Sequence, residues 1–146
     1  MSKLQTPFRY DFVGSFLRPQ VLKDAKAAYR DGKISKEEFD KVVDEEIIKV
    51  VAKQKELGFH AITDGEFRRT FWHLDFMWGL DGVAHENTGN GVKFDAELAV
   101  LDDTYLVGKI KAKAHPFVEY FKFLKQFEDE NTVCLLYTSD AADEED

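Results

Sequence analysis

Hydrophobic side chains recur with a helical period over one long stretch of the chain. The segment is preceded by Ser35 and Glu38, which form an S-x-x-E capping box, and it is followed by Gly58, a residue type common just after a helix end. Charged side chains occupy most of the opposite face. The pattern predicts a helix between Ser35 and Gly58, and its apolar face comprises Phe39, Val42, Val43, Ile47, Val50, Val51 and Leu57.

Two more segments have helical periodicity. Residues 18–32 predict a helix with Pro19 in its first turn, and residues 115–130 predict another that carries Pro116 at its start. Residues 70–80 predict a helix or a structured loop. Residues 81–103 contain many Gly, Asn and Asp residues and predict an irregular excursion or a ribbon.

Short apolar runs between these helices predict strands at residues 10–15, 59–63 and 104–110, and a fourth that begins at residue 131. Alternation of strands and helices favours a parallel sheet, and no G-x-G-x-x-G motif follows the first strand, which disfavours a dinucleotide-binding fold. We therefore expect an α/β fold. It would be a partial (β/α)8 TIM-type barrel over residues 1–133, with three βα units and the start of strand four, where a full barrel needs ~250 residues.

The end of the sequence departs from this alternation. Residues 134–144, CLLYTSDAADE, resemble one reading frame of the transposon-end adapter used in DNA library preparation. We expect residues 134–146 to be a non-native tail, and the natural protein to continue beyond Val133. Cys134 is accordingly assigned no metal, redox or nucleophilic role.

Composition narrows the class of protein. The chain has 146 residues, 44% hydrophobic, and a net charge of −8, of which five negative charges lie in the last seven residues and −3 remains for the rest. No basic stripe indicates nucleic-acid binding, and no apolar run approaches the ~18 residues of a membrane span. A single cysteine is typical of the reducing cytoplasm. These features set aside nucleic acid and the membrane as partners. They leave the oligomeric state open.

Barrel enzymes place their chemistry at the carboxyl ends of strands. Here that rule selects Gly14 with Ser15, the loop from Asp64 to Arg69, and the region of Gly108, Lys109 and His115. Gly14 and Ser15 suit the binding of an anion; alternatively, Ser15 simply caps the following helix. Glu66 suits an ammonium group; alternatively, it pairs with Arg68 or Arg69. Further residues expected to line the site are Asp64, Arg68, His73 and Asp75.

Three stretches together resemble the cobalamin-independent methionine synthase family, in particular its short members that consist of the catalytic barrel alone. They are DFVGSFLRP, QKELGFHAITDGEFRRTFWHLDF and VGKI…HP…FKFLK, and the resemblance covers about residues 8–133. It implies transfer of a methyl group from a methyltetrahydrofolate to the thiol of homocysteine, which a zinc ion holds as a thiolate. By the same resemblance, Val13, Gly14, Ser15 and Glu66 bind the amino-acid part of homocysteine, and this segment supplies no catalytic residue.

The sequence also departs from the family pattern. Asp64-Gly65-Glu66 stands where methionine synthase has an H-G-E-type motif, and the region that contacts the folate has no clear counterpart. The zinc ligands of the family, an H-x-C pair, a glutamate and a further cysteine, are expected downstream of this segment. Two alternatives remain open: a related alkyl transferase with another thiol acceptor such as coenzyme M, and a truncated product without activity.

Overall fold

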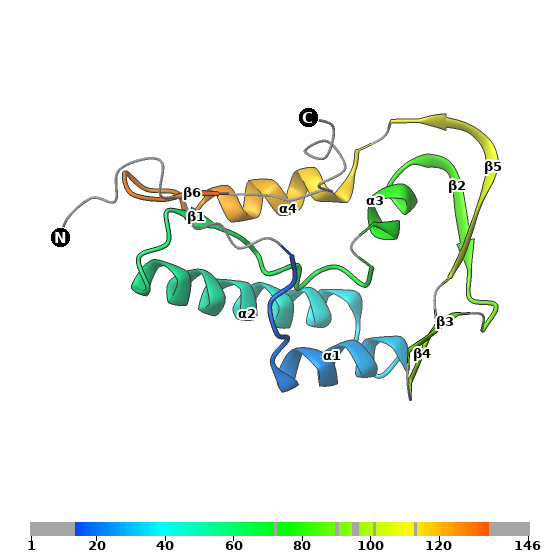
Figure 1. The fold of residues 1–146 in the computed structure, drawn as a ribbon, viewed down its shortest axis with the longest axis horizontal. Helices are drawn as coiled ribbons and strands as arrows, with labels where there is room; N and C mark the ends of the chain where they lie inside the picture. Colours follow the sequence, from blue (N-terminus) through cyan, green and yellow to red (C-terminus); the bar gives the residue numbers. More distant parts are fainter. Residues whose placement is uncertain are drawn as a thin grey trace. The chain divides into compact units, whose positions relative to one another are not determined.

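The computed structural model describes residues 14–71, 73–89, 91–94, 97–100, 102–112 and 114–134. They form two compact units (Figure 1). The first contains the chain up to Arg69 and from Phe121 onward, and the second contains Thr70–Tyr120. In the described residues, no helix is long and apolar enough to cross a lipid bilayer.

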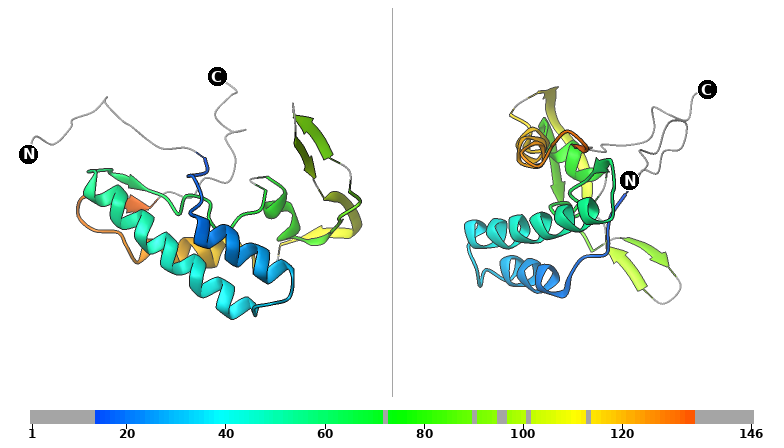
Figure 2. Two further views of the ribbon diagram at one scale, coloured as in Figure 1. Left: turned by 90° about the horizontal axis from the view of Figure 1, so that it is seen from below. Right: turned by 90° about the vertical axis from the view of Figure 1, so that its left-hand side faces the viewer.

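The first unit contains two antiparallel helices, α1 (Gln20–Arg30) and α2 (Lys36–Glu56), which run side by side (Figures 1 and 2). The predicted capping box is confirmed, because Ser35 Oγ accepts from Glu38 N at 3.1 Å and Glu38 Oε2 accepts from Ser35 N at 2.7 Å. After α2, Gly58 has φ +82° and Phe59 N donates to Gln54 O at 3.0 Å, a Schellman motif that only a residue tolerant of left-handed backbone allows.

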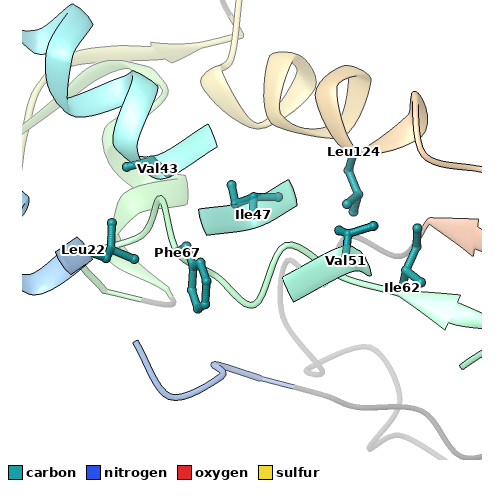
Figure 3. Close-up of a cluster of buried hydrophobic side chains, with 7 residues drawn as sticks. All are labelled: Leu22, Val43, Ile47, Val51, Ile62, Phe67 and Leu124. Atoms are coloured by element: carbon teal, nitrogen blue, oxygen red, sulfur yellow. The ribbon is translucent and has the colours of Figure 1, made fainter. Parts of the chain in front are cut away.

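The hydrophobic core of the first unit lies between these helices, a short strand β1 (Ala61–Ile62) and the end of helix α4 (Pro116–Lys125) (Figure 3). Its seven buried side chains are at most 3% exposed. The predicted apolar face of α2 supplies three of them. The core consists of Leu22, Val43, Ile47, Val51, Ile62, Phe67 and Leu124.

β1 pairs in parallel with β6 (Val133–Cys134), in the register Ala61↔Val133 and Ile62↔Cys134. The parallel direction agrees with the predicted parallel sheet, but the prediction placed a strand at residues 104–110 between these two strands and did not make them neighbours. The boundary predicted between Val133 and Cys134 falls inside β6; the remainder of the predicted tail lies outside the described residues, and so does most of the strand predicted at residues 10–15.

The second unit corrects the predicted barrel topology. It contains α3 (Leu74–Trp78), then β2 (Asp81–Glu86) paired antiparallel with β5 (Asp103–Lys111), and a hairpin of β3 (Gly91–Phe94) with β4 (Glu97–Val100). The prediction that residues 104–110 form a third parallel barrel strand is therefore wrong, and so is the count of three βα units. Across the described residues, the only parallel pair is β1–β6.

The physical reason for this error lies in β5 itself. Its side chains are exposed along its whole length, although residues 105–107 form an apolar run, Tyr-Leu-Val. An apolar run predicts a strand but not the direction of its partner. The partner is β2, in the segment predicted as an irregular excursion or a ribbon, with Val83 opposite Leu106 and Ala84 opposite Tyr105.

Candidate substrate-binding site

The loop after β1 forms the centre of the candidate site. All residues from Ile62 to Phe67 are buried. The loop begins at Thr63, whose backbone N–H donates to Gln54 Oε1 at 2.9 Å and whose carbonyl oxygen accepts from Gln54 Nε2 at 2.8 Å. The sequence analysis gave Gln54 no role. The signal that could have identified it is a polar side chain on the otherwise apolar face of α2.

The backbone of this loop turns through two consecutive left-handed residues. Gly65 has φ +63°, and a Cβ atom there would approach Phe16 and Phe67 to 3.1 Å. Glu66 has φ +58°, the only non-glycine residue with positive φ in the described chain. Left-handed backbone is unfavourable for a side chain such as glutamate, so surrounding contacts must hold it. One is Asp64 Oδ1, which accepts from Glu66 N at 2.9 Å.

The segment around Ser15 lies against this turn. Phe16 N donates to Gly65 O at 3.1 Å, and Ser15 Oγ donates to Glu66 Oε2 at 2.7 Å. The structure therefore brings together two residues that are 51 positions apart and that the sequence assigned to one site. The alternative that Ser15 caps the following helix is wrong, because α1 begins at Gln20 with Pro19 at its N-cap.

The Glu66 carboxylate has a second partner. Arg69 Nη1 lies 3.4 Å from Glu66 Oε1, and both side chains are nearly buried, at 3% and 10% exposure. The ion pair with Arg69, which the sequence left as an alternative role for Glu66, is thus present. At that distance the hydrogen bond is weak. An ionised carboxylate has about four acceptor positions, so Glu66 keeps capacity for a further donor.

Two cations of the first helical segment bind the loop through its backbone. Arg18 Nη2 donates to Glu66 O at 3.1 Å and to Arg69 O at 3.2 Å, and Lys26 Nζ lies 3.3 Å from Arg69 O. The sequence analysis gave neither residue a role. The only sequence signal for a role of Arg18 was its position three residues after Ser15. Its acceptors are backbone carbonyl oxygens, which cannot be identified from sequence.

The Asp64 side chain stabilises the turn of the loop. Burial raises the pKa of its carboxyl group, while the hydrogen bond from Glu66 N and the charges of Arg69 and Arg68 oppose that rise. Its side chain is acceptor to a backbone N–H two residues along the chain, an arrangement typical of an Asx turn.

Three other residues were predicted to line the site: Arg68, His73 and Asp75. Arg68 forms an ion pair with Asp44 of α2, and its guanidinium lies 4.9 Å from the centre of the Phe123 ring. His73 and Asp75 belong to the second unit; Asp75 accepts from Thr70 N at 2.7 Å and from Phe71 N at 3.0 Å. Gly14 lies in the described chain with φ +93°, whereas Val13 is outside it.

The described residues do not suit the zinc ion that the family resemblance implies. They contain no group of three or more His, Cys, Asp or Glu side chains able to hold a metal ion. Burial, and then the neighbouring Glu128 carboxylate, raise the pKa of the Cys134 thiol to about 11, which disfavours the thiolate that zinc binds. No step of a reaction is therefore assigned to zinc on these residues.

Comparisons with known proteins place the chain in a family. The model of the cobalamin-independent synthase catalytic domain matches residues 9–118. The chain belongs to this family. A protein from Listeria monocytogenes, named as a vitamin-B12-independent methionine synthase, has a similar structure, with a TM-score of 0.70, 39% identity, and coverage of 90% of this chain and 36% of that one.

Two relatives illustrate the range of similarity. The uncharacterized protein YxjG of Bacillus subtilis is 37% identical over 124 residues, which are 85% of this chain and 33% of YxjG. The 5-methyltetrahydropteroyltriglutamate–homocysteine methyltransferase of Thermotoga petrophila is 38% identical over 77 residues, which are 53% of this chain and 10% of that enzyme. The chain thus spans about a third of the length of YxjG.

Proposed function

We propose that this segment binds the amino-acid part of homocysteine in a cobalamin-independent methionine synthase-type methyltransferase. In this proposal the Glu66 carboxylate receives the ammonium group, and the backbone and hydroxyl around Ser15 receive the carboxylate. The observation that supports it is the 2.7 Å hydrogen bond between Ser15 and Glu66 in a chain of this family. Serine hydroxyls both donate and accept, so Ser15 can bind Glu66 and a ligand together.

The chemistry of Glu66 favours an amino acid over coenzyme M as the thiol acceptor. A nearly buried carboxylate stabilises a cation and repels an anion. Homocysteine carries an ammonium group, whereas coenzyme M carries a sulfonate and no cation. The long contact between Glu66 and Arg69 leaves the carboxylate able to accept a charge-assisted hydrogen bond from that ammonium.

Three further parts of the proposal concern the complete protein. The methyl donor would be a methyltetrahydrofolate, in keeping with the name of the Thermotoga petrophila relative. Zinc, when bound, would hold the homocysteine thiol as a thiolate, on ligands outside the described residues. The parallel pair β1–β6 would belong to a (β/α)8 barrel whose remaining strands lie in the other two-thirds of the relatives' length.

The proposal is tested by Glu66→Gln in the complete gene product that contains this segment. A charge-assisted hydrogen bond contributes about 1.5–3 kcal/mol, so we expect the Kd for L-homocysteine to rise roughly 10- to 150-fold. Calorimetric titration measures the Kd for L-homocysteine and, for comparison, the Kd for coenzyme M (2-mercaptoethanesulfonate). The value of kcat/KM for methyl transfer should fall by a similar factor. The matched control is Glu45→Gln, at an exposed position of α2, which should change neither quantity.

The outcomes separate the roles of Glu66. A lower melting temperature with unchanged homocysteine affinity would refute the binding role and leave only the ion pair with Arg69. Tight binding of 2-mercaptoethanesulfonate that is unaffected by Glu66→Gln would favour the other thiol acceptor. Zinc content should equal that of the wild type in every variant, since Glu66 is not proposed as a ligand.

A further inference from the structure

The Arg18 side chain connects the two ends of the left-handed turn. One nitrogen, Nη2, donates to the carbonyl oxygen of Glu66 at 3.1 Å and to that of Arg69 at 3.2 Å. The same two carbonyls belong to a short turn in which Arg69 N donates to Glu66 O at 3.1 Å. Arg18 therefore binds the backbone of the residue whose carboxylate lies beside Ser15, and not the carboxylate itself.

The conformation of Glu66 requires such a contact. Its φ of +58° is a region that L-residues avoid, and residues held there persist only when their surroundings over-determine them. Asp64 Oδ1 holds the N–H of Glu66 and Arg18 holds its carbonyl oxygen. The two peptide groups that flank Cα of Glu66 are thus both bound by side chains. These bonds set the direction in which the Glu66 side chain extends from the backbone.

The surroundings of Arg18 indicate that this is its main contact. In the described chain it forms no salt bridge, and its Nε atom is buried without a hydrogen-bond partner. Burying part of a charged guanidinium is costly unless the group is paired or hydrogen-bonded, so the bonds that Arg18 does form offset that cost. The partners of Arg18 in the described chain are two carbonyl oxygens, and both lie in the loop that carries Glu66.

We propose that Arg18 is a positioning residue, which holds Glu66 in its left-handed conformation and thereby sets the affinity of the site for the ammonium group of an amino acid. The inference rests on the proposed function of Glu66. Arg18 touches neither the ligand nor the reacting thiol, so its effect should appear in the binding of homocysteine and not in the chemical step.

Three variants of the complete gene product test this role: Arg18→Met, Arg18→Lys and the double variant Arg18→Met with Glu66→Gln. Two hydrogen bonds from a charged donor are lost in Arg18→Met, so we expect KM for L-homocysteine to rise roughly 10-fold with kcat changed by less than about 2-fold. Arg18→Lys keeps the charge and should lose about 3-fold. In the Glu66→Gln background, Arg18→Met should add less than about 2-fold, because coupled residues are not additive.

The matched control is Arg30→Met, an exposed arginine on α1, which should leave KM and kcat unchanged. If Arg18→Met lowers kcat and the melting temperature with KM unchanged, or raises KM equally in both backgrounds, Arg18 does not act through Glu66. If Arg18→Met does not fold, an unchanged KM in Arg18→Lys overturns the proposal. An effect of Glu66→Gln without one of Arg18→Met removes the positioning role alone; no effect of Glu66→Gln removes the proposed function as well.

Discussion

Replacing Glu66 with glycine should leave the protein more stable than replacing it with alanine. Both changes remove the hydrogen bond from Ser15 and the contact with Arg69, so these losses cancel when the two variants are compared. What remains is the backbone, which has φ +58° at this position. Alanine in left-handed backbone costs about 1–2 kcal/mol, whereas the extra chain entropy that glycine loses on folding is about 0.5–1 kcal/mol.

The central values of these two costs leave roughly 0.75 kcal/mol in favour of glycine at position 66. Lys41 provides the matched control, since it is exposed in the interior of α2. There the order should reverse, with alanine more stable than glycine by about 0.8–1.0 kcal/mol. Urea unfolding of the four variants, followed by circular dichroism, measures both differences. Equal stability of the two variants at position 66, or greater stability with alanine, would refute the left-handed conformation of Glu66 provided the Lys41 pair behaves as expected.

Three further outcomes are expected. Ile47→Ala, at a fully buried core position, should lower the free energy of unfolding by about 2–5 kcal/mol, whereas Ile48→Ala, at a position 45% exposed, should lower it by under about 1 kcal/mol. Equal losses in urea unfolding would contradict the assigned core face of α2. Because burial raises the pKa of Asp64 in the folded chain, stability should fall as the pH rises from the ordinary carboxyl pKa through the raised one, and Asp64→Asn should remove that fall; an unchanged pH profile of the unfolding free energy would count against it. With a pKa of about 11, the Cys134 thiol should react with iodoacetamide at pH 8 on the order of 100-fold more slowly than an ordinary cysteine, and urea should abolish the difference; fast labelling of the native chain would argue against its burial.

Local features of this protein were readable from sequence because the atoms involved are close along the chain. The capping box of α2 joins residues three positions apart, and the Schellman motif at Gly58 joins atoms within the last turn and the two residues that follow it. The apolar face of α2 follows from the 3.6-residue period alone. The site itself was predicted by a different route: Ser15 and Glu66 were assigned together through the family resemblance, and their hydrogen bond is a contact that periodicity does not contain.

Only the tertiary structure decided the direction of β5 and the contacts around the loop. The apolar run at residues 105–107 of β5 was predicted to lie in a parallel strand, yet β5 pairs antiparallel with β2. Strand direction depends on which partner offers free backbone groups and not on the strand's own residues. Arg18 could not be assigned from sequence because its acceptors are backbone carbonyls, which every residue has, and only the fold determines which of them face an arginine 48 and 51 positions away. Glutamate disfavours left-handed backbone, so the φ of Glu66 could not be predicted from its residue type. Asp64 and Arg18 stabilise that conformation by binding the peptide groups on either side of Glu66.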